Sequence, residues 1–262
     1  MRISRSSIVV TMVAVLVLGC GRPAAGPAQP AEPRTFASPG QAAQALYEAE
    51  RNNDESAARA ILGAGPELTS AGSDIDDKVN REQFVKKYQE MHRLVHEPDG
   101  TTILHIGAEN WPYPVPLIAK QGRWYFDSDA GRQEVLAREI GQNEFTAVQV
   151  GQAFVSGGGR GSETDSGPSG DRIRAFASTL RNAKDANAKN AQSFHGYYFR
   201  VVTEEPGGVA LVAYPAAYRT SGVMTFLLTS SGVVYEKDLG PQTATLAPQL
   251  RAAPANDWVV VE

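Results

Sequence analysis

The chain has 262 residues, of which 42% are hydrophobic and 21% charged, so it holds enough apolar material for one large or two small domains. Its 25 basic and 29 acidic residues give a formal net charge of −4, and no basic cluster is present, so we expect no nucleic-acid partner. The single cysteine excludes an intrachain disulfide and a cysteine-ligated zinc site.

The first predicted feature is a lipoprotein signal peptide over residues 1–19. Two arginines precede an apolar run of eleven residues, 8–18, which is shorter than the ~20 residues that span a bilayer. A small residue, Gly19, precedes Cys20, and this order resembles the site at which bacterial lipoproteins are cleaved and lipidated. We therefore expect lipidation of Cys20 and a membrane partner reached through this anchor.

Residues 20–35 are predicted to form a tether between the lipid and the folded body. They contain four prolines and almost nothing to bury, a composition typical of an extended linker. Gly21 follows the lipidated cysteine, where an aspartate would resemble the inner-membrane retention signal of enteric bacteria. The expected location is thus the cell envelope, and the periplasmic face of the outer membrane more than the inner membrane.

Residues 36–155 are predicted to form a unit of helices and a curved sheet. Ser38 is a good N-cap and Pro39 suits the first helical position, so a helix starts here. A second helix is predicted over 55–62 and ends at Gly63.

A third helix is predicted over residues 77–94. Three aspartates at its start favour capping of a helix N-terminus over a calcium loop, because a calcium loop needs further oxygen ligands at fixed positions. His92 and His96 lie four residues apart, a spacing that could place two imidazoles on one metal if the helix extends this far. No His-Glu-x-x-His pattern is present, and a solvated helix face explains the pair as well, so we predict no metal site.

The next segment indicates strands. Residues 111–118 have proline at every second position, so they are extended but cannot form a fully bonded central strand. The turn Gln121–Gly122 predicts a hairpin with a return strand over 123–127. A helix is predicted over 131–154, and the Gly/Ser-rich stretch 156–170 predicts a linker.

Residues 171–262 are predicted to form a helix and an antiparallel β unit. Alternating apolar residues and short turns indicate the following elements: a helix over 171–188, strands over 196–202 and 209–214, a hairpin of 223–228 with 233–235, and an edge strand over 258–261. The fold class is therefore α+β. The first unit is similar to the cone-shaped fold of the nuclear-transport-factor-two superfamily, and the second to the head of type IV pilin-like proteins.

Several stretches resemble a family of bacterial lipoproteins known as domain of unknown function 2950. They cover about residues 36–155 and 194–262 in one collinear order, and they are Phe36–Ala43, Ile61–Gly63, Trp111–Leu117, Trp124–Gly131, Ile140–Glu144, Gly196–Arg200, Ser221–Phe226 and Tyr235–Gly240. Members carry a longer middle segment rich in Tyr, Trp and Gly, where this chain has only residues 156–170. The resemblance implies kinship and no particular activity.

Aromatic residues near the predicted strands are the candidates for partner binding, namely Trp111, Tyr113 and Trp124. If exposed, they could stack on a glycan or grip an envelope protein. Tyr197 and Tyr198 share this pattern. Packing in the core or at a sheet edge is the alternative for all five, because aromatic side chains dominate core energetics.

We find no catalytic constellation. A Gly-x-Ser-x-Gly motif and a cofactor fingerprint are both missing, and no cofactor is expected. His195 has no evident carboxylate partner, and Asp127, Asp129 and Glu134 could act as a general-acid pair only if the fold brings them together. We therefore expect a non-enzymatic binding or assembly module. The alternative is a pocket in the first unit that binds a small ligand or hydrolyses it.

Overall fold

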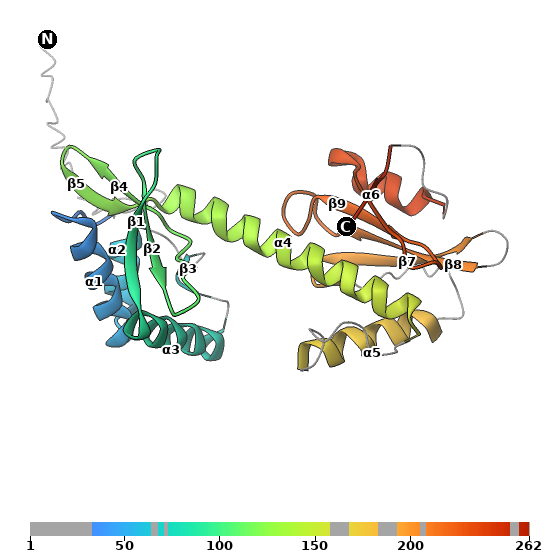
Figure 1. Cartoon of the computed structure of the whole chain (residues 1–262), viewed down its shortest axis with the longest axis horizontal. Coiled ribbons are helices and arrows are strands. Elements are labelled where there is room, and N and C mark those ends of the chain that lie inside the picture. The colour runs from blue at the N-terminus through green and yellow to red at the C-terminus, as the bar shows by residue number, and fades with distance from the viewer. Residues whose placement is uncertain are drawn as a thin grey trace, which may run out of the picture.

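The computed structural model describes residues 33–63, 68–70, 73–157, 168–182, 193–204, 208–251 and 257–261. Two lobes are joined by one long helix, α4 (Ser128–Val155), as Figure 1 shows. The architecture is α+β, as the sequence predicted. Within these ranges, no helix combines the length and the apolar character needed to cross a bilayer. The predicted signal peptide and most of the tether lie outside the described residues.

The N-terminal lobe contains three helices and an antiparallel sheet of five short strands. Its elements are α1 (Pro39–Arg51), α2 (Glu55–Leu62), α3 (Asp74–Glu90), β1 (His92–His96), β2 (Thr102–Ile106), β3 (Trp111–Pro112), β4 (Leu117–Lys120) and β5 (Arg123–Phe126). The strand order is β1-β2-β4-β5, and β3 pairs with β2. The hairpin of β4 and β5 turns at the predicted residues.

The first two helices confirm the predicted capping. The hydroxyl of Ser38 accepts the N–H of Gln41 at 3.2 Å, and Pro39 opens α1. At the end of α2, Gly63 adopts a left-handed conformation with φ of 60°, which glycine tolerates without a steric penalty. α1 and α2 then bury small and apolar side chains against the sheet, including Ala42, Leu46 and Ile61.

The third helix ends earlier than predicted, and the assignment of His92 and His96 to it is wrong. α3 ends at Glu90, and Met91 is already extended, with φ of −164°. Residues 92–96 form β1 instead, because their backbone groups pair with all five residues of β2. The predicted capping by the aspartates holds in outline, since Asp74, Asp76 and Asp77 lie in the first turn behind the N-cap Ser73.

The C-terminal lobe is built on a six-stranded antiparallel sheet in the order β11-β10-β9-β8-β7-β6. Its elements are α5 (Pro168–Asn182), β6 (Ser193–Phe194), β7 (Tyr197–Glu204), β8 (Gly208–Pro215), β9 (Met224–Leu228), β10 (Val234–Asp238), a 3-10 turn (Gly240–Gln242), α6 (Thr243–Leu246), a second 3-10 turn (Ala247–Gln249) and β11 (Val259–Val260). The predicted strands, the hairpin of β9 with β10 and the edge strand β11 are confirmed.

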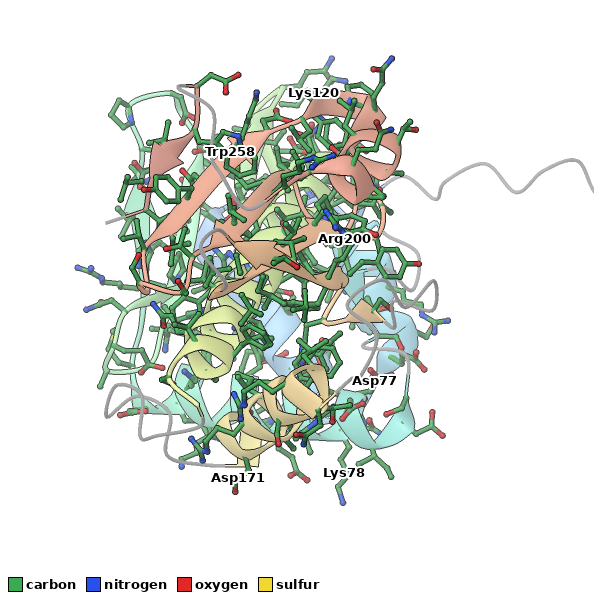
Figure 2. The ribbon with its side chains drawn as sticks, turned by 90° about the vertical axis from the view of Figure 1, so that its right-hand side faces the viewer. Asp77, Lys78, Lys120, Asp171, Arg200 and Trp258 are labelled. Carbon is green, nitrogen blue, oxygen red and sulfur yellow. The ribbon has the colours of Figure 1, made fainter. Side chains whose placement is uncertain are left out.

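Both faces of this sheet are covered. Alternate residues of β8 point to opposite faces, so Leu211 and Ala213 meet α4 and α5, whereas Val212 meets the segment around α6. Viewed from the end of the molecule, the sheet lies between these two layers (Figure 2). Tyr197 and Tyr198 belong to these cores, Tyr197 fully buried and Tyr198 partly, which favours the packing interpretation for both.

Helix α4 contributes one half to each lobe. Near its start, the hydroxyl of Ser128 donates to the carbonyl of Leu62, and Arg138 Nη1 donates to the carbonyl of Pro112 at 2.9 Å. The second half packs into the C-terminal core, so residues 147–155 lie with the second sheet although the sequence analysis grouped them with the first unit. The predicted linker, 156–170, lies mostly outside the described residues, and its last three residues already belong to α5, which begins at Pro168 rather than at residue 171.

A carboxylate fixes α4 to the C-terminal sheet. One oxygen of Glu144 accepts the N–H groups of Val223 and Met224 at 2.9 and 3.0 Å, and the hydroxyl of Tyr197 lies 3.4 Å from the same oxygen and 2.9 Å from the carbonyl of Met224. The neighbouring Asn143 donates its amide to the carbonyl of Ser221 at 3.1 Å. Three of the stretches on which the family resemblance rests therefore meet at one contact, whose role is structural.

Candidate functional site

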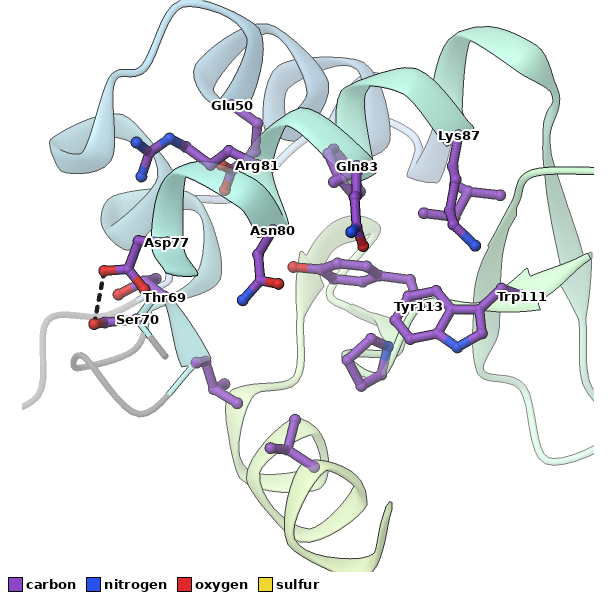
Figure 3. Close-up of a pocket in the computed structure, with 15 residues that line it drawn as sticks. Glu50, Thr69, Ser70, Asp77, Asn80, Arg81, Gln83, Lys87, Trp111 and Tyr113 are labelled. Carbon is purple, nitrogen blue, oxygen red and sulfur yellow. Dashed lines mark hydrogen bonds between the residues drawn. The ribbon is translucent and has the colours of Figure 1, made fainter. Parts of the chain in front are cut away.

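An open groove of about 580 Å³ lies in the N-terminal lobe beneath α3, and we call it the α3 groove. Described residues that line it come from α1, the segment before α3, α3 itself, β2, the proline-rich segment and α4. They are Glu50, Leu68, Thr69, Ser70, Asp77, Asn80, Arg81, Gln83, Phe84, Lys87, Ile106, Trp111, Tyr113, Pro114 and Val135. Figure 3 shows the polar face of α3 above the ring of Tyr113, with Trp111 at one end and Ser70 at the other.

Aromatic rings form the floor of the α3 groove. The ring of Tyr113 meets Phe84 edge-on with centroids 5.5 Å apart and Phe126 at 6.1 Å, so neighbouring rings hold it in place. The ring centroids of Trp111 and Tyr113 are 6.5 Å apart, and Trp111 keeps 38% of its surface exposed. The guanidinium of Arg138 lies 5.0 Å from the indole centroid, which fixes this ring from the side of α4.

The proline-rich segment explains why this edge of the sheet stays open. Tyr113 turns its N–H inward and donates to the carbonyl of Leu104 at 2.7 Å. Because successive backbone groups of an extended chain point in opposite directions, the outward groups beside Tyr113 belong to positions 112 and 114, and Pro112 turns its carbonyl outward to Arg138. Both positions are prolines, which have no N–H, so no further strand can pair fully with the edge beside Tyr113.

The opposite wall is the polar face of α3. Asn80, Gln83 and Lys87 recur at helical spacing, so they form one row along the groove. Asn80 and Gln83 are exposed, and their amide groups can both donate and accept hydrogen bonds. Figure 3 shows the hydroxyl of Tyr113 pointing toward the Asn80 side of the groove.

Charges in the α3 groove are balanced. Glu50 and Asp77 oppose Arg81 and Lys87 among the described lining residues. Lys87 forms an ion pair with Glu109, and Ser70 donates its hydroxyl to Asp77 at 2.8 Å. The groove therefore presents hydrogen-bonding groups without a strong field of one sign.

Burial shifts two pKa values here. It raises the pKa of the Glu50 carboxyl, although the positive charge of Arg81 works in the opposite direction. It also raises the pKa of the Tyr113 phenol, to which the negative charge of Glu50 adds. At neutral pH the phenol of Tyr113 thus keeps its proton and can donate a hydrogen bond into the groove.

The described lining of the groove lacks the imidazole of a serine or cysteine hydrolase. It contains neither histidine nor cysteine, and its contact between Ser70 and Asp77 has no imidazole to take the serine proton. Stacking and hydrogen bonding are the chemistry that these side chains can perform.

The other candidate catalytic residues are engaged elsewhere. Asp127 caps α4 by accepting the N–H groups of Asp129 and Ala130, both at 3.1 Å. Asp129 pairs with Arg132, and Glu134 pairs with Arg138. The structure therefore does not bring these carboxylates together at a cavity, and none of them lines the α3 groove.

The histidines have separate partners. The ring of His92 stacks on that of Tyr88 with centroids 3.9 Å apart, and its Nδ1 contacts the Tyr88 carbonyl. His96 Nδ1 lies 2.7 Å from the hydroxyl of Thr102. His195 stacks edge-on against Phe194, and burial lowers its pKa. Across the described ranges, no three His, Cys, Asp or Glu residues are grouped so that they could hold a metal ion.

The structure separates the three aromatic candidates. Trp111 and Tyr113 share the α3 groove, whereas Trp124 does not line it. Trp124 forms a backbone bridge with Phe36 and packs on the first core. Glu50, Asn80 and Gln83 were not among the site residues predicted from the sequence. The helical spacing of polar residues was a signal for Asn80 and Gln83.

The two segments of the chain that match a family model cover both lobes. Residues 33–185 and 162–261 match the family described as Protein of unknown function (DUF2950). The chain belongs to this family. The resemblance found in the sequence is thus confirmed for the family, whose description names no activity. No curated protein and no solved structure matches the chain, so the cone-like and pilin-head-like comparisons stay predictions.

Proposed function

We propose that this protein is a lipid-anchored binding module of the bacterial cell envelope and that the α3 groove is its ligand site. The observation that carries the proposal is the pairing of two walls: a fixed aromatic floor with Trp111 exposed, and a row of hydrogen-bonding side chains on α3. Sites that bind ligands without chemistry combine apolar surface with a few convergent polar groups.

The form of the groove favours a binding module over the alternative of a closed pocket. The core beneath it is filled by residues such as Leu117 and Phe126, both with 0% exposure. The groove lies above this core, so a ligand can enter without opening the lobe. The described lining residues include no histidine or cysteine that could act as a nucleophile or its base.

The proposed anchor rests on the sequence. Cys20 follows a basic start, an apolar run and Gly19, and the tether after it provides the length that lifts the lobes off the membrane. Several acyl chains on one cysteine would anchor the protein stably, since each buried CH₂ contributes about 0.8 kcal/mol.

The anchor is tested by fractionating cells that express Cys20→Ser. This variant should move from the membrane pellet to the soluble fraction and lose labelling by radioactive palmitate. Gly21→Asp is the matched control, because it changes the neighbouring residue and keeps the acylated cysteine, so it should stay in the pellet. A Cys20→Ser variant that stays membrane-bound and unlabelled would show that another feature anchors the protein.

The ligand site is tested with envelope material separated into glycan, lipid, peptide and small-molecule fractions. At least one fraction should raise the melting temperature of the wild-type protein, because a ligand that binds only the folded state stabilises it. The double variant Asn80→Ala/Gln83→Ala should lose this response and keep its fold, since both positions are exposed on a helix. If no fraction stabilises the wild type, or if the variant responds equally, the groove is not the ligand site.

A further inference from the structure

The dimensions of the α3 groove limit the size of its ligand. Asn80 and Lys87 mark the ends of the polar row, and seven residues of helix span about 10 Å at 1.5 Å per residue. This is roughly the length of a disaccharide. Because the groove is open rather than closed, a longer chain could continue beyond both ends of the row.

The charges of the groove disfavour a charged ligand. Its two carboxylates and two cationic side chains balance, and Lys87 is already paired with Glu109. A phosphate or a polyanion requires an excess of Lys or Arg, as in nucleic-acid sites. A neutral ligand with many hydroxyl groups meets no such requirement, and the amides of Asn80 and Gln83 can both donate to hydroxyl groups and accept from them.

The proline-rich edge disfavours an extended peptide. Peptides that add a strand to a sheet gain their affinity from backbone hydrogen bonds. Pro112 and Pro114, on either side of Tyr113, supply no N–H to such a strand, so the edge beside the groove lacks outward donors there. A ligand of this groove must therefore be held by side chains.

Trp111 provides the remaining element. Its indole is partly exposed, and Arg138 lies over one face and fixes the ring, so a ligand that stacks on the indole takes the other face without first ordering the ring. The face of an aromatic ring is negatively polarised and attracts the C–H groups that cover one side of a pyranose ring. Asn80 and Gln83 are about 5–6 Å apart at their Cβ atoms by helical spacing, which suits hydroxyl groups on neighbouring sugar units.

From these four observations we infer that the α3 groove binds an uncharged oligosaccharide, with one sugar ring stacked on Trp111 and the next held by the amides of Asn80 and Gln83. This inference rests on the proposed function, since it names the ligand class of the same site. It assigns the groove to a glycan of the envelope rather than to a protein.

The test uses the full chain purified in mild detergent and three neutral probes: chitotetraose, cellotetraose and maltotetraose. At least one should bind saturably in isothermal titration calorimetry and change the tryptophan fluorescence. Trp111→Ala should weaken binding tenfold or more, and Asn80→Ala/Gln83→Ala should do the same. Phe145→Ala is the matched aromatic control, because Phe145 is 56% exposed on α4 and does not line the groove, so its affinity should equal that of the wild type.

Two further probes distinguish the possible failures. A sulfated heparin tetrasaccharide and a proline-rich decapeptide should both fail to bind. If either binds at the groove and the neutral sugars do not, the oligosaccharide inference is wrong and the proposed function stands. If the sugars bind equally well to the Trp111→Ala and Asn80→Ala/Gln83→Ala variants, the inference is wrong because their site lies elsewhere. If no neutral sugar binds the wild type and no envelope fraction stabilises it, both proposals fail.

Discussion

The two lobes use their sheets differently. In the C-terminal lobe both sheet faces are covered, and Leu211 and Val212, on opposite faces of β8, are each 0% exposed. In the N-terminal lobe the strands are shorter and a mixed polar and aromatic groove opens between α3 and the proline-rich segment. Under the proposed function, the second lobe is the scaffold and the first lobe carries recognition, because the groove of the first lobe combines apolar surface with several polar groups.

Three glycines spaced ten residues apart in α4 differ in how closely their surroundings pack. A Cβ atom at Gly131 would lie 2.8 Å from Val115 Cγ2, and one at Gly151 would overlap the side chain of Leu228. At Gly141, in the exposed stretch between the lobes, nothing lies within 4 Å. The outer glycines thus permit close packing on each lobe, whereas the central one has no packing reason.

The largest expected effect is at the scaffold end of α4. Gly151→Ala should destabilise the protein by about 1–3 kcal/mol, because Leu228 is 1% exposed and cannot move aside without disturbing the core. The free energy of unfolding from urea titration measures this change. A loss below the error of the titration would mean that the contact of α4 with β9 is looser than described.

The second prediction concerns the carboxylate that joins α4 to the sheet. Glu144→Ala should cost about 1–2 kcal/mol, since it leaves the N–H groups of Val223 and Met224 without their acceptor. Glu144→Gln keeps a side-chain oxygen and should cost less. Glu139→Ala, at an exposed position of the same helix, is the control and should be nearly neutral. Equal losses for Ala and Gln would assign the effect to charge rather than to the hydrogen bonds.

Local signals in the sequence predicted most of the fold. Ser38 with Pro39, Gly63 and the turn Gln121–Gly122 each act within a few residues, and each marks the predicted boundary. The predicted end of α3 was wrong because the pairing of β1 with β2 overrides the helical pattern of 91–94, and that pairing joins His92 to Ile106, outside the reach of a helical pattern.

The candidate site was only half predictable for the same reason. Trp111 and Tyr113 are recognisable as aromatic residues between prolines, so the sequence could propose them. Both share the groove with Asn80 on α3 and Glu50 on α1, which lie some thirty to sixty positions earlier in the chain. Tertiary packing brings these residues together, and the spacing of apolar residues in the sequence does not encode it. Trp124 carried the same local signal and lies outside the groove.

A smaller change of stability, opposite in sign to that of Gly151→Ala, is expected in the stretch of α4 between the lobes. Gly141→Ala should stabilise the protein by about 0.5–1 kcal/mol, because alanine favours the helix and meets no neighbour there. Thermal unfolding of this variant beside Gly151→Ala gives two substitutions of the same type with opposite signs. A destabilised Gly141→Ala would show that the connecting stretch needs a conformation other than a regular helix, and the comparison of the two glycines would fail.

The smallest effect belongs to the groove and depends on pH. Burial raises the pKa of Glu50 above its ordinary value, so this carboxyl holds its proton in the folded state at pH values where the unfolded chain has lost it. Across that window the folded state binds more protons, and its stability therefore falls as the pH rises from the ordinary pKa of the carboxyl through the raised one. Glu50→Gln cannot ionise and should lose less stability than the wild type as the pH rises above the ordinary pKa of a glutamate carboxyl, and Glu48→Gln, at an exposed position of the same helix, is the control. Melting temperatures across this range measure the difference. Parallel curves for all three proteins would show that Glu50 is as well hydrated as Glu48, and the groove would then be wetter at its α1 end than its packing implies.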